Sequence, residues 1–208
     1  MMTNANTLTA TTEPKSLWAE QSRLRARRQR VMQELVRIRA DLERLSLLLK
    51  RDRFALHDAV IDADAQDVRD LIAQGAKVNA RNQDGLTPLY LAVCAERPVA
   101  VVRALLEAGA KVDAGDNEGS TPLIVAVDDS QLPVVRELIR HGADPNARNT
   151  DGDTPLTNAA AWGSKRVVEL LLKSGADPKL ADGAGIPPAD LALQQGHSLI
   201  AERIRRAS

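Results

Sequence analysis

The sequence predicts an all-α fold, a solenoid in which short helix-turn-helix units stack along one axis. A Thr-Pro-Leu phrase recurs with its threonines at Thr87, Thr121 and Thr154, in steps of 34 and 33 residues. A Gly-Ala phrase keeps the same step, with its glycines at Gly75, Gly109, Gly142 and Gly175. Two phrases that share one period of this length indicate a repeat array. Since one unit cannot bury its apolar faces alone, the units must stack.

The chemistry of a single unit predicts two helices and a projecting finger. The Thr87 hydroxyl can cap a helix, and Pro88 suits the first helical position, where no N–H is needed. Pro98 then starts a second helix whose buried stripe is expected at Val101, Val102, Leu105 and Leu106. Gly109 suits the left-handed residue that ends a helix. The polar turn that follows, up to Gly119, predicts a hairpin-like finger.

With this period and these phrases, the segment from about residue 52 to residue 206 resembles the ankyrin repeat family. The resemblance implies repeats at about 52–83, 84–116, 117–149 and 150–182, and a C-terminal cap at 183–208. Ankyrin repeats often carry His after Thr-Pro-Leu. Only His57 fits here, and the other slots hold Tyr90, Ile124, Thr157 and Asp190. This departure is expected to weaken hydrogen bonding between repeats without threatening the fold.

The N-terminal quarter has a different pattern. Residues 1–15 are rich in Thr, Asn and Ala and predict a disordered leader. Residues 16–51 contain no Gly or Pro and predict one long amphipathic helix preceding the repeats. Its heptad places apolar residues at Leu17, Leu24, Val31, Leu35, Ile38, Leu42, Leu45 and Leu49.

Two interpretations of this helix stay open. One is a coiled-coil homodimer held by Leu24, Val31, Leu35, Ile38, Leu42 and Leu45. The other is a long helix that caps the first repeat, which Leu47 and Leu48 favour by widening the apolar stripe. The core positions Gln21 and Arg28 are polar, so the heptad seam is poor over its first half.

Charge is divided along the chain although the formal net charge is zero. Residues 15–53 carry 12 basic and 5 acidic side chains, whereas residues 54–208 carry 16 basic and 22 acidic ones. An arginine cluster between Arg23 and Arg30 raises the possibility of a nucleic-acid or anionic surface. No aromatic residues interleave with it and no nucleic-acid motif is present, so we favour a solvated helix surface and predict no nucleic-acid partner.

No arrangement of residues predicts catalysis, a metal or a cofactor. His57, His141 and His197 fall at different places in their repeats, and stacking does not bring them together. Cys94, the only cysteine, lacks a basic activator and is expected to be a small buried or half-buried residue. No apolar run is long enough for a membrane span, and residues 1–16 lack a secretory signal pattern. We therefore expect a non-enzymatic cytoplasmic protein.

Recognition of another protein is the function that the resemblance implies. Ankyrin repeats bind partners through the finger tips and the inner helices, which line a concave face. The matching finger positions are Arg81, Gln83, Asp84, Leu86, Asn117, Glu118, Ser120, Arg148, Thr150, Asp151 and Asp153, and the matching helix-end positions are Asp62, Asp128, Asp129, Trp162 and Gln195.

Seven of these positions are acidic, two are basic, and one holds a large aromatic residue, Trp162. An exposed tryptophan is a common binding anchor, and the alternative is a ring packed flat over the turn between two helices. The acidic character implies a partner with a basic patch. The sequence thus predicts an adaptor or scaffold. The alternative is an inhibitor or immunity-type protein that blocks an enzyme or toxin with this acidic face.

Overall fold

The computed structural model describes residues 27–39, 55–61 and 64–207, and the chain divides into two units, Met1–Lys50 and Arg51–Ser208. Helix is the regular secondary structure over these residues, and they contain no strand. None of their helices is long and apolar enough to cross a membrane. The predicted leader at 1–15 lies outside the described residues.

In the first unit, residues 27–39 form a helix, as the heptad pattern predicts for this stretch. Every residue of this helix is exposed, including the apolar Val31, Leu35 and Ile38. The rest of the predicted helix, with Leu24, Leu42 and Leu45, lies outside the described residues.

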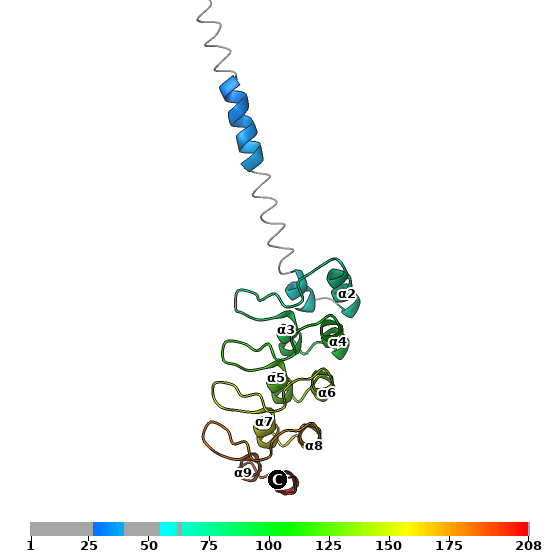
Figure 1. Cartoon of the computed structure of the whole chain (residues 1–208), viewed down its shortest axis with the longest axis vertical. Coiled ribbons are helices and arrows are strands. Elements are labelled where there is room, and N and C mark those ends of the chain that lie inside the picture. Colours follow the sequence, from blue (N-terminus) through cyan, green and yellow to red (C-terminus); the bar gives the residue numbers. More distant parts are fainter. Residues whose placement is uncertain (1–26, 40–54, 62–63, 208) are drawn as a thin grey trace, which may run out of the picture. The chain divides into compact units, whose positions relative to one another are not determined.

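The second unit is a stack of helix pairs (Figure 1). Its inner helices form one column, its outer helices form a second column, and loops project from the inner side like fingers. The inner helices are α3 (Pro88–Cys94), α5 (Pro122–Asp128), α7 (Pro155–Ala161) and α9 (Pro188–Gln194). The outer helices are α2 (Ala65–Ala73), α4 (Val99–Glu107), α6 (Leu132–Arg140), α8 (Lys165–Lys173) and α10 (Ser198–Arg205), and residues 55–61 form a helical segment before α2. The predicted all-α solenoid is confirmed.

Local sequence explains where the inner helices begin. The hydroxyl oxygens of Thr87 and Thr121 each accept a hydrogen bond from the backbone N–H three residues later, at 3.3 and 3.4 Å. Thr154 does the same as part of a capping box. Each threonine is followed by a proline at the first helical position, where the missing N–H costs nothing. Gly109, at φ +85°, supplies the left-handed residue after α4.

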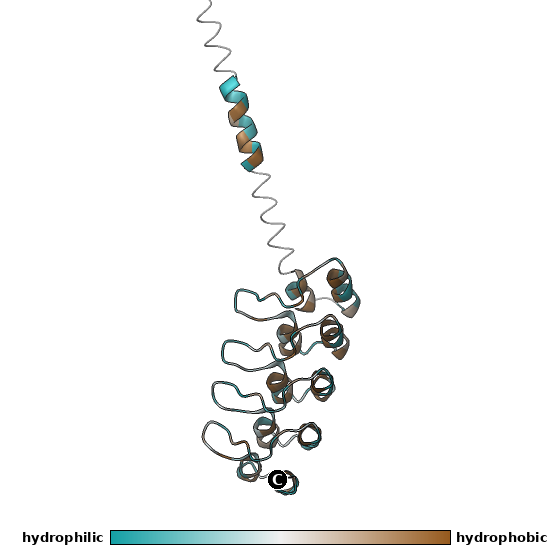
Figure 2. Cartoon of the chain, viewed as in Figure 1, coloured by the Kyte–Doolittle hydropathy of each residue, from teal (hydrophilic) through white to brown (hydrophobic). Residues whose placement is uncertain are grey.

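The core lies between the helix pairs and runs the length of the array. In the three helix pairs α3–α4, α5–α6 and α7–α8, one leucine of each helix has an exposed fraction of 0 or 1%: Leu89, Leu123 and Leu156 in the inner helices, and Leu105, Leu138 and Leu171 in the outer helices. Apolar residues concentrate in these helices and polar residues in the fingers (Figure 2). Because each helix pair within the array is covered by the pairs next to it, stability depends on adjacent repeats rather than on one central core.

The C-terminal repeat ends the stack. Leu193 is 44% exposed, whereas the matching Val93, Val127 and Ala160 of the earlier repeats are fully buried. On α10, Arg203 and Arg205 stand where earlier outer helices carry mostly apolar residues, and Arg205 forms an ion pair with Asp190 at 2.9 Å. A polar outer surface is what a terminal repeat requires.

The slot that often holds His in ankyrin repeats is used differently in each repeat. His57 places Nε2 3.0 Å from the Ala80 carbonyl oxygen and 3.1 Å from that of Leu86, which fixes the following finger. Tyr90 recovers such a bond, because its hydroxyl donates to Asp116 at 2.6 Å. Thr157 instead bonds within its own helix start, to Thr154. The predicted weakening is therefore avoided at Tyr90.

Candidate protein-binding surface

Four fingers project from the inner column, and we name them finger A (77–86), B (111–120), C (144–153) and D (177–186). Each is shaped by an Asn or Asp at the same position: Asn82, Asp116, Asn149 and Asp182. The side-chain oxygen of Asn82 accepts hydrogen bonds from the backbone N–H of Asp84 and Leu86 at 3.0 and 2.9 Å. The other three accept an equivalent bond from the residue four positions later, at 2.8–2.9 Å. These bonds hold the finger tips in a defined shape.

Most of the predicted finger residues are on the surface. The exposed ones are Arg81, Gln83, Asp84, Asn117, Glu118, Arg148, Thr150 and Asp151, and the half-buried ones are Leu86, Ser120 and Asp153. Fingers B and C lie side by side, since the Thr150 N–H donates to the Glu118 carbonyl at 2.8 Å. The carboxylates of Glu118 and Asp151 therefore belong to neighbouring tips.

The two arginines of the fingers, Arg81 and Arg148, are already engaged by the backbone. Arg81 donates to the carbonyl oxygen of Gly85 in its own finger and to that of Gly115 in finger B, the latter at 3.1 Å. Arg148 donates to the Gly152 carbonyl at 3.1 Å and to the Ala181 carbonyl in finger D at 3.0 Å. These guanidinium groups hold adjacent fingers together and leave the neighbouring carboxylates without an ion pair to them.

The ends of α5 and α7 bring the predicted helix-end residues together. Asp128 is the last residue of α5, and Asp129 follows it. Trp162 follows α7 and has an exposed fraction of 65%. Gln195 occupies the same place after α9 and is exposed. Asp62 lies outside the described residues.

Asp128 and Trp162 share a polar cluster that sequence reasoning missed. The Asn158 side-chain amide donates to the Asp128 carboxylate at 2.7 Å, and the Trp162 side chain lies close enough to lower the pKa of that carboxyl. Asn158 is one helical turn before Trp162, so the i, i+4 spacing was the available signal. The cluster joins the ends of neighbouring inner helices.

The carboxylates of this surface repel one another. Burial raises the pKa of Asp128 above its ordinary value, the charges of Asp129 and Asp153 add to the rise, and the polar groups of Asn158 and Trp162 oppose it. Burial also raises the pKa of Asp153, together with the charges of Asp182 and Asp151. A raised carboxyl pKa means that the folded state bears an electrostatic cost when these groups are ionised. A cation placed among them would lower that cost.

The prediction for Cys94 was a buried or half-buried residue, whereas the structure exposes it at the end of α3. Desolvation raises the pKa of its thiol, and the charge of Asp129 raises it further. A raised thiol pKa reduces the thiolate fraction at neutral pH, the opposite of what a nucleophile needs. Over the described residues, no group of three or more His, Cys, Asp or Glu side chains is arranged to hold a metal ion.

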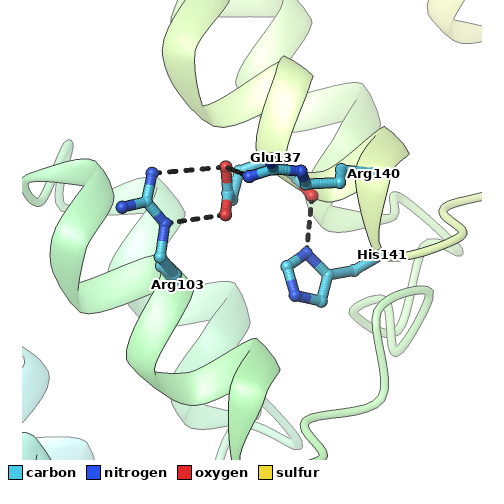
Figure 3. A network of polar contacts seen from close by, with 4 residues as sticks. All are labelled: Arg103, Glu137, Arg140 and His141. Atoms are coloured by element: carbon cyan, nitrogen blue, oxygen red, sulfur yellow. Dashed lines mark hydrogen bonds and ion pairs between the residues drawn. The ribbon is translucent and has the colours of Figure 1, made fainter.

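The outer helices carry a separate polar network (Figure 3). Arg103 of α4 donates to the Glu137 carboxylate of α6 at 2.8 Å, and Arg140 lies 3.6 Å from the same carboxylate. Glu137 has an exposed fraction of only 4%, and the hydrogen bond from Arg103 lowers its pKa below the ordinary value. The His141 ring donates through Nδ1 to the Glu137 carbonyl at 3.0 Å. This network links two repeats on the side opposite to the fingers.

Stacked helix pairs with a row of projecting fingers define a class of repeat solenoid that presents an extended surface. A family model described as ankyrin repeats (3 copies) matches residues 56–149, 114–182 and 129–204. The chain belongs to the ankyrin repeat family, whose members are in general protein–protein interaction modules. No curated protein matches the chain.

Proposed function

We propose that this protein is a non-enzymatic adaptor that binds a partner protein through its finger tips and the ends of α5 and α7. The observation that carries the proposal is Trp162, 65% exposed beside the Asp128 carboxylate. Tryptophan is enriched among the residues that dominate binding energy, and a large exposed indole has apolar surface to bury in a complex. Its position between repeats allows one partner to contact several units.

The chemistry of the partner follows from the charges around Trp162. Asp128, Asp129 and Asp153 lie near one another, and the pKa values of Asp128 and Asp153 are raised. A partner that presents Lys or Arg around an apolar spot would pair with these carboxylates while covering the indole. The proposed partner is therefore a protein with a basic patch.

The first experiment uses the full chain and its Trp162→Ala variant in parallel affinity purifications. A protein retained by the wild type and lost by the variant is then purified and titrated against both. We expect Trp162→Ala to weaken binding by at least about 2 kcal/mol, the level that defines a hot spot. Leu199→Ala is the matched control, because Leu199 is 75% exposed but lies on the outer helix α10. Equal binding by all three proteins would exclude this surface.

Charge reversal distinguishes the effect of the carboxylates on the association rate from the effect of Trp162 on affinity. Asp128→Lys and Asp129→Lys are expected to slow association of the same partner, with a smaller effect on dissociation. Raised salt should slow association by the wild type in the same way, since it screens exposed charges. If the partner is an enzyme or toxin, inhibition of its activity by the wild type and not by the Trp162→Ala variant would identify the inhibitor function rather than an adaptor.

A second proposal concerns the helix at 27–39, which we infer to mediate homodimerisation. Val31, Leu35 and Ile38 occupy successive core positions of the predicted heptad and are 48, 54 and 55% exposed. Light scattering of the full chain should give twice the monomer mass. The variant Leu35→Asp should give the mass of one monomer. A wild-type monomer at high concentration would reject the dimer and favour the capping interpretation.

A further inference from the structure

The hydrogen bonds that join successive fingers are not equivalent. We call the bonds between fingers A and B the A–B link, and name the B–C and C–D links in the same way. Position 79 in finger A corresponds to position 113 in finger B and to position 146 in finger C. The Asn79 amide donates to the Gly109 carbonyl at 2.9 Å, and its oxygen accepts from the Lys111 N–H at 2.7 Å. Asn146 makes the same two bonds to Gly175 and Asp177, at 3.0 and 2.8 Å. One amide thus donates and accepts across the A–B link and across the C–D link.

Between fingers B and C this position is Asp113. Its carboxylate accepts from the Asp144 N–H at 3.1 Å. An ionised carboxylate has no donor, so the bond that Asn79 and Asn146 give to a carbonyl cannot form here. Burial raises the pKa of Asp113, and the charge of Asp144 adds to the rise, so this link also bears an electrostatic cost.

A second position repeats the alternation. Arg81 donates across the A–B link to Gly115, and Arg148 donates across the C–D link to Ala181. Across the B–C link the corresponding residue is Gly115, which has no side chain. A Cβ at Gly115 would lie 2.6 Å from the Ser120 carbonyl oxygen, so a larger residue does not fit there. Fingers B and C therefore keep two hydrogen bonds, from the Asp144 N–H to the Asp113 carboxylate and from the Thr150 N–H to the Glu118 carbonyl.

The same pair of repeats is tied firmly on the opposite side. Arg103 and the buried carboxylate of Glu137 join α4 to α6 at 2.8 Å (Figure 3). Finger B is also attached to α3 through the Tyr90–Asp116 bond. A strong tie at the outer helices and a weaker one at the fingers allow rotation about the outer side.

We propose that the B–C link is a hinge, at which the finger row opens as two pairs, A with B and C with D, about a pivot at the Arg103–Glu137 bridge. The pairs carry different parts of the surface described above, with Glu118 on one and Asp151 and Asp153 on the other. Opening at the hinge changes the spacing between these carboxylates. The hinge is a property of the finger row and holds whether or not that surface binds a partner.

Hydrogen exchange of three equivalent backbone amides in the full chain tests the hinge. The N–H groups of Lys111, Asp144 and Asp177 donate to Asn79, Asp113 and Asn146, so they differ in the link that protects them. After correction for intrinsic rates, we expect Asp144 to exchange about tenfold faster than Lys111 and Asp177, the effect of one hydrogen bond. Equal protection at the three amides would overturn the proposal.

The variant Asp113→Asn restores a donor to the B–C link. We expect it to slow exchange of the Asp144 amide about tenfold and to slow the Thr150 amide in parallel, since both open with the hinge. Asn146→Asp is the reciprocal control and should accelerate the Asp177 amide. If Asp113→Asn slows Asp144 alone and leaves Thr150 unchanged, the difference is one local bond and there is no hinge.

Discussion

The repeat array and the helix at 27–39 carry similar apolar patterns with opposite outcomes. In the array, Leu89, Leu123 and Leu138 are fully buried because each helix pair is covered by the next. In the helix at 27–39, Leu35 and Ile38 occupy equally regular positions and are 54 and 55% exposed. An apolar stripe therefore indicates that a helix has an apolar face suited to burial. Whether that face is buried depends on a neighbouring element that packs against it.

The largest effect is expected at a buried array leucine. Leu138→Ala and Leu171→Ala should each lower the free energy of unfolding by about 2–5 kcal/mol, because each leaves a cavity between repeats. Chemical denaturation of the full chain measures this loss. Leu199→Ala, at a 75% exposed position, should stay within about 0.5 kcal/mol of the wild type. Similar losses at buried and exposed leucines would contradict the claim that burial between repeats determines how much a leucine contributes to stability.

The polar tie between α4 and α6 should contribute less and should depend on pH. Glu137→Gln replaces the charged partner of Arg103 and is expected to cost on the order of 1 kcal/mol at pH 7. The folded-state pKa of Glu137 is lowered, so the contribution is complete above the ordinary value of 4.5 and is lost as the pH falls through the lowered one. Denaturation at pH 7 and pH 3 should therefore show the variant and the wild type converging in acid.

At the helix 27–39, truncation of an apolar side chain should leave the array intact. If the helix dimerises and does not cap the first repeat, the melting temperature of Leu35→Ala at low protein concentration should match that of the wild type. At high concentration the variant should dissociate more readily if the helix dimerises, because a core leucine is lost from the seam. A lower melting temperature at every concentration would show instead that Leu35 stabilises the array.

The smallest effect on stability is expected at Trp162. Because its side chain is 65% exposed, Trp162→Ala should change the free energy of unfolding by less than about 0.5 kcal/mol while it weakens partner binding. Thermal melting of the two proteins checks this. A fall of many degrees would show that the indole packs on the array, and the partner would then have to be sought on the outer helices.

Much of the fold could be predicted because its signals are local. Thr87 and Pro88 determine where an inner helix begins, and Gly109 suits the residue that follows an outer helix, all within one short stretch of chain. The exposed state of Cys94 was not predicted, since it depends on how the end of α3 meets its neighbours. The roles of Arg81 and Arg148 were also missed, because their carbonyl partners lie one whole repeat away.

By itself, the sequence determined the period, the helix pairs and the solenoid, because caps, turns and apolar stripes act over a few residues. The tertiary structure decided how the side chains on the inner face are used. It placed Asn158 and Trp162 beside Asp128 and raised the pKa of that carboxyl. It also left the Asp113 side chain with one hydrogen bond to the next finger, from the Asp144 N–H. Those outcomes depend on distances and burial between residues about thirty positions apart, which only the stacking of one repeat on the next creates.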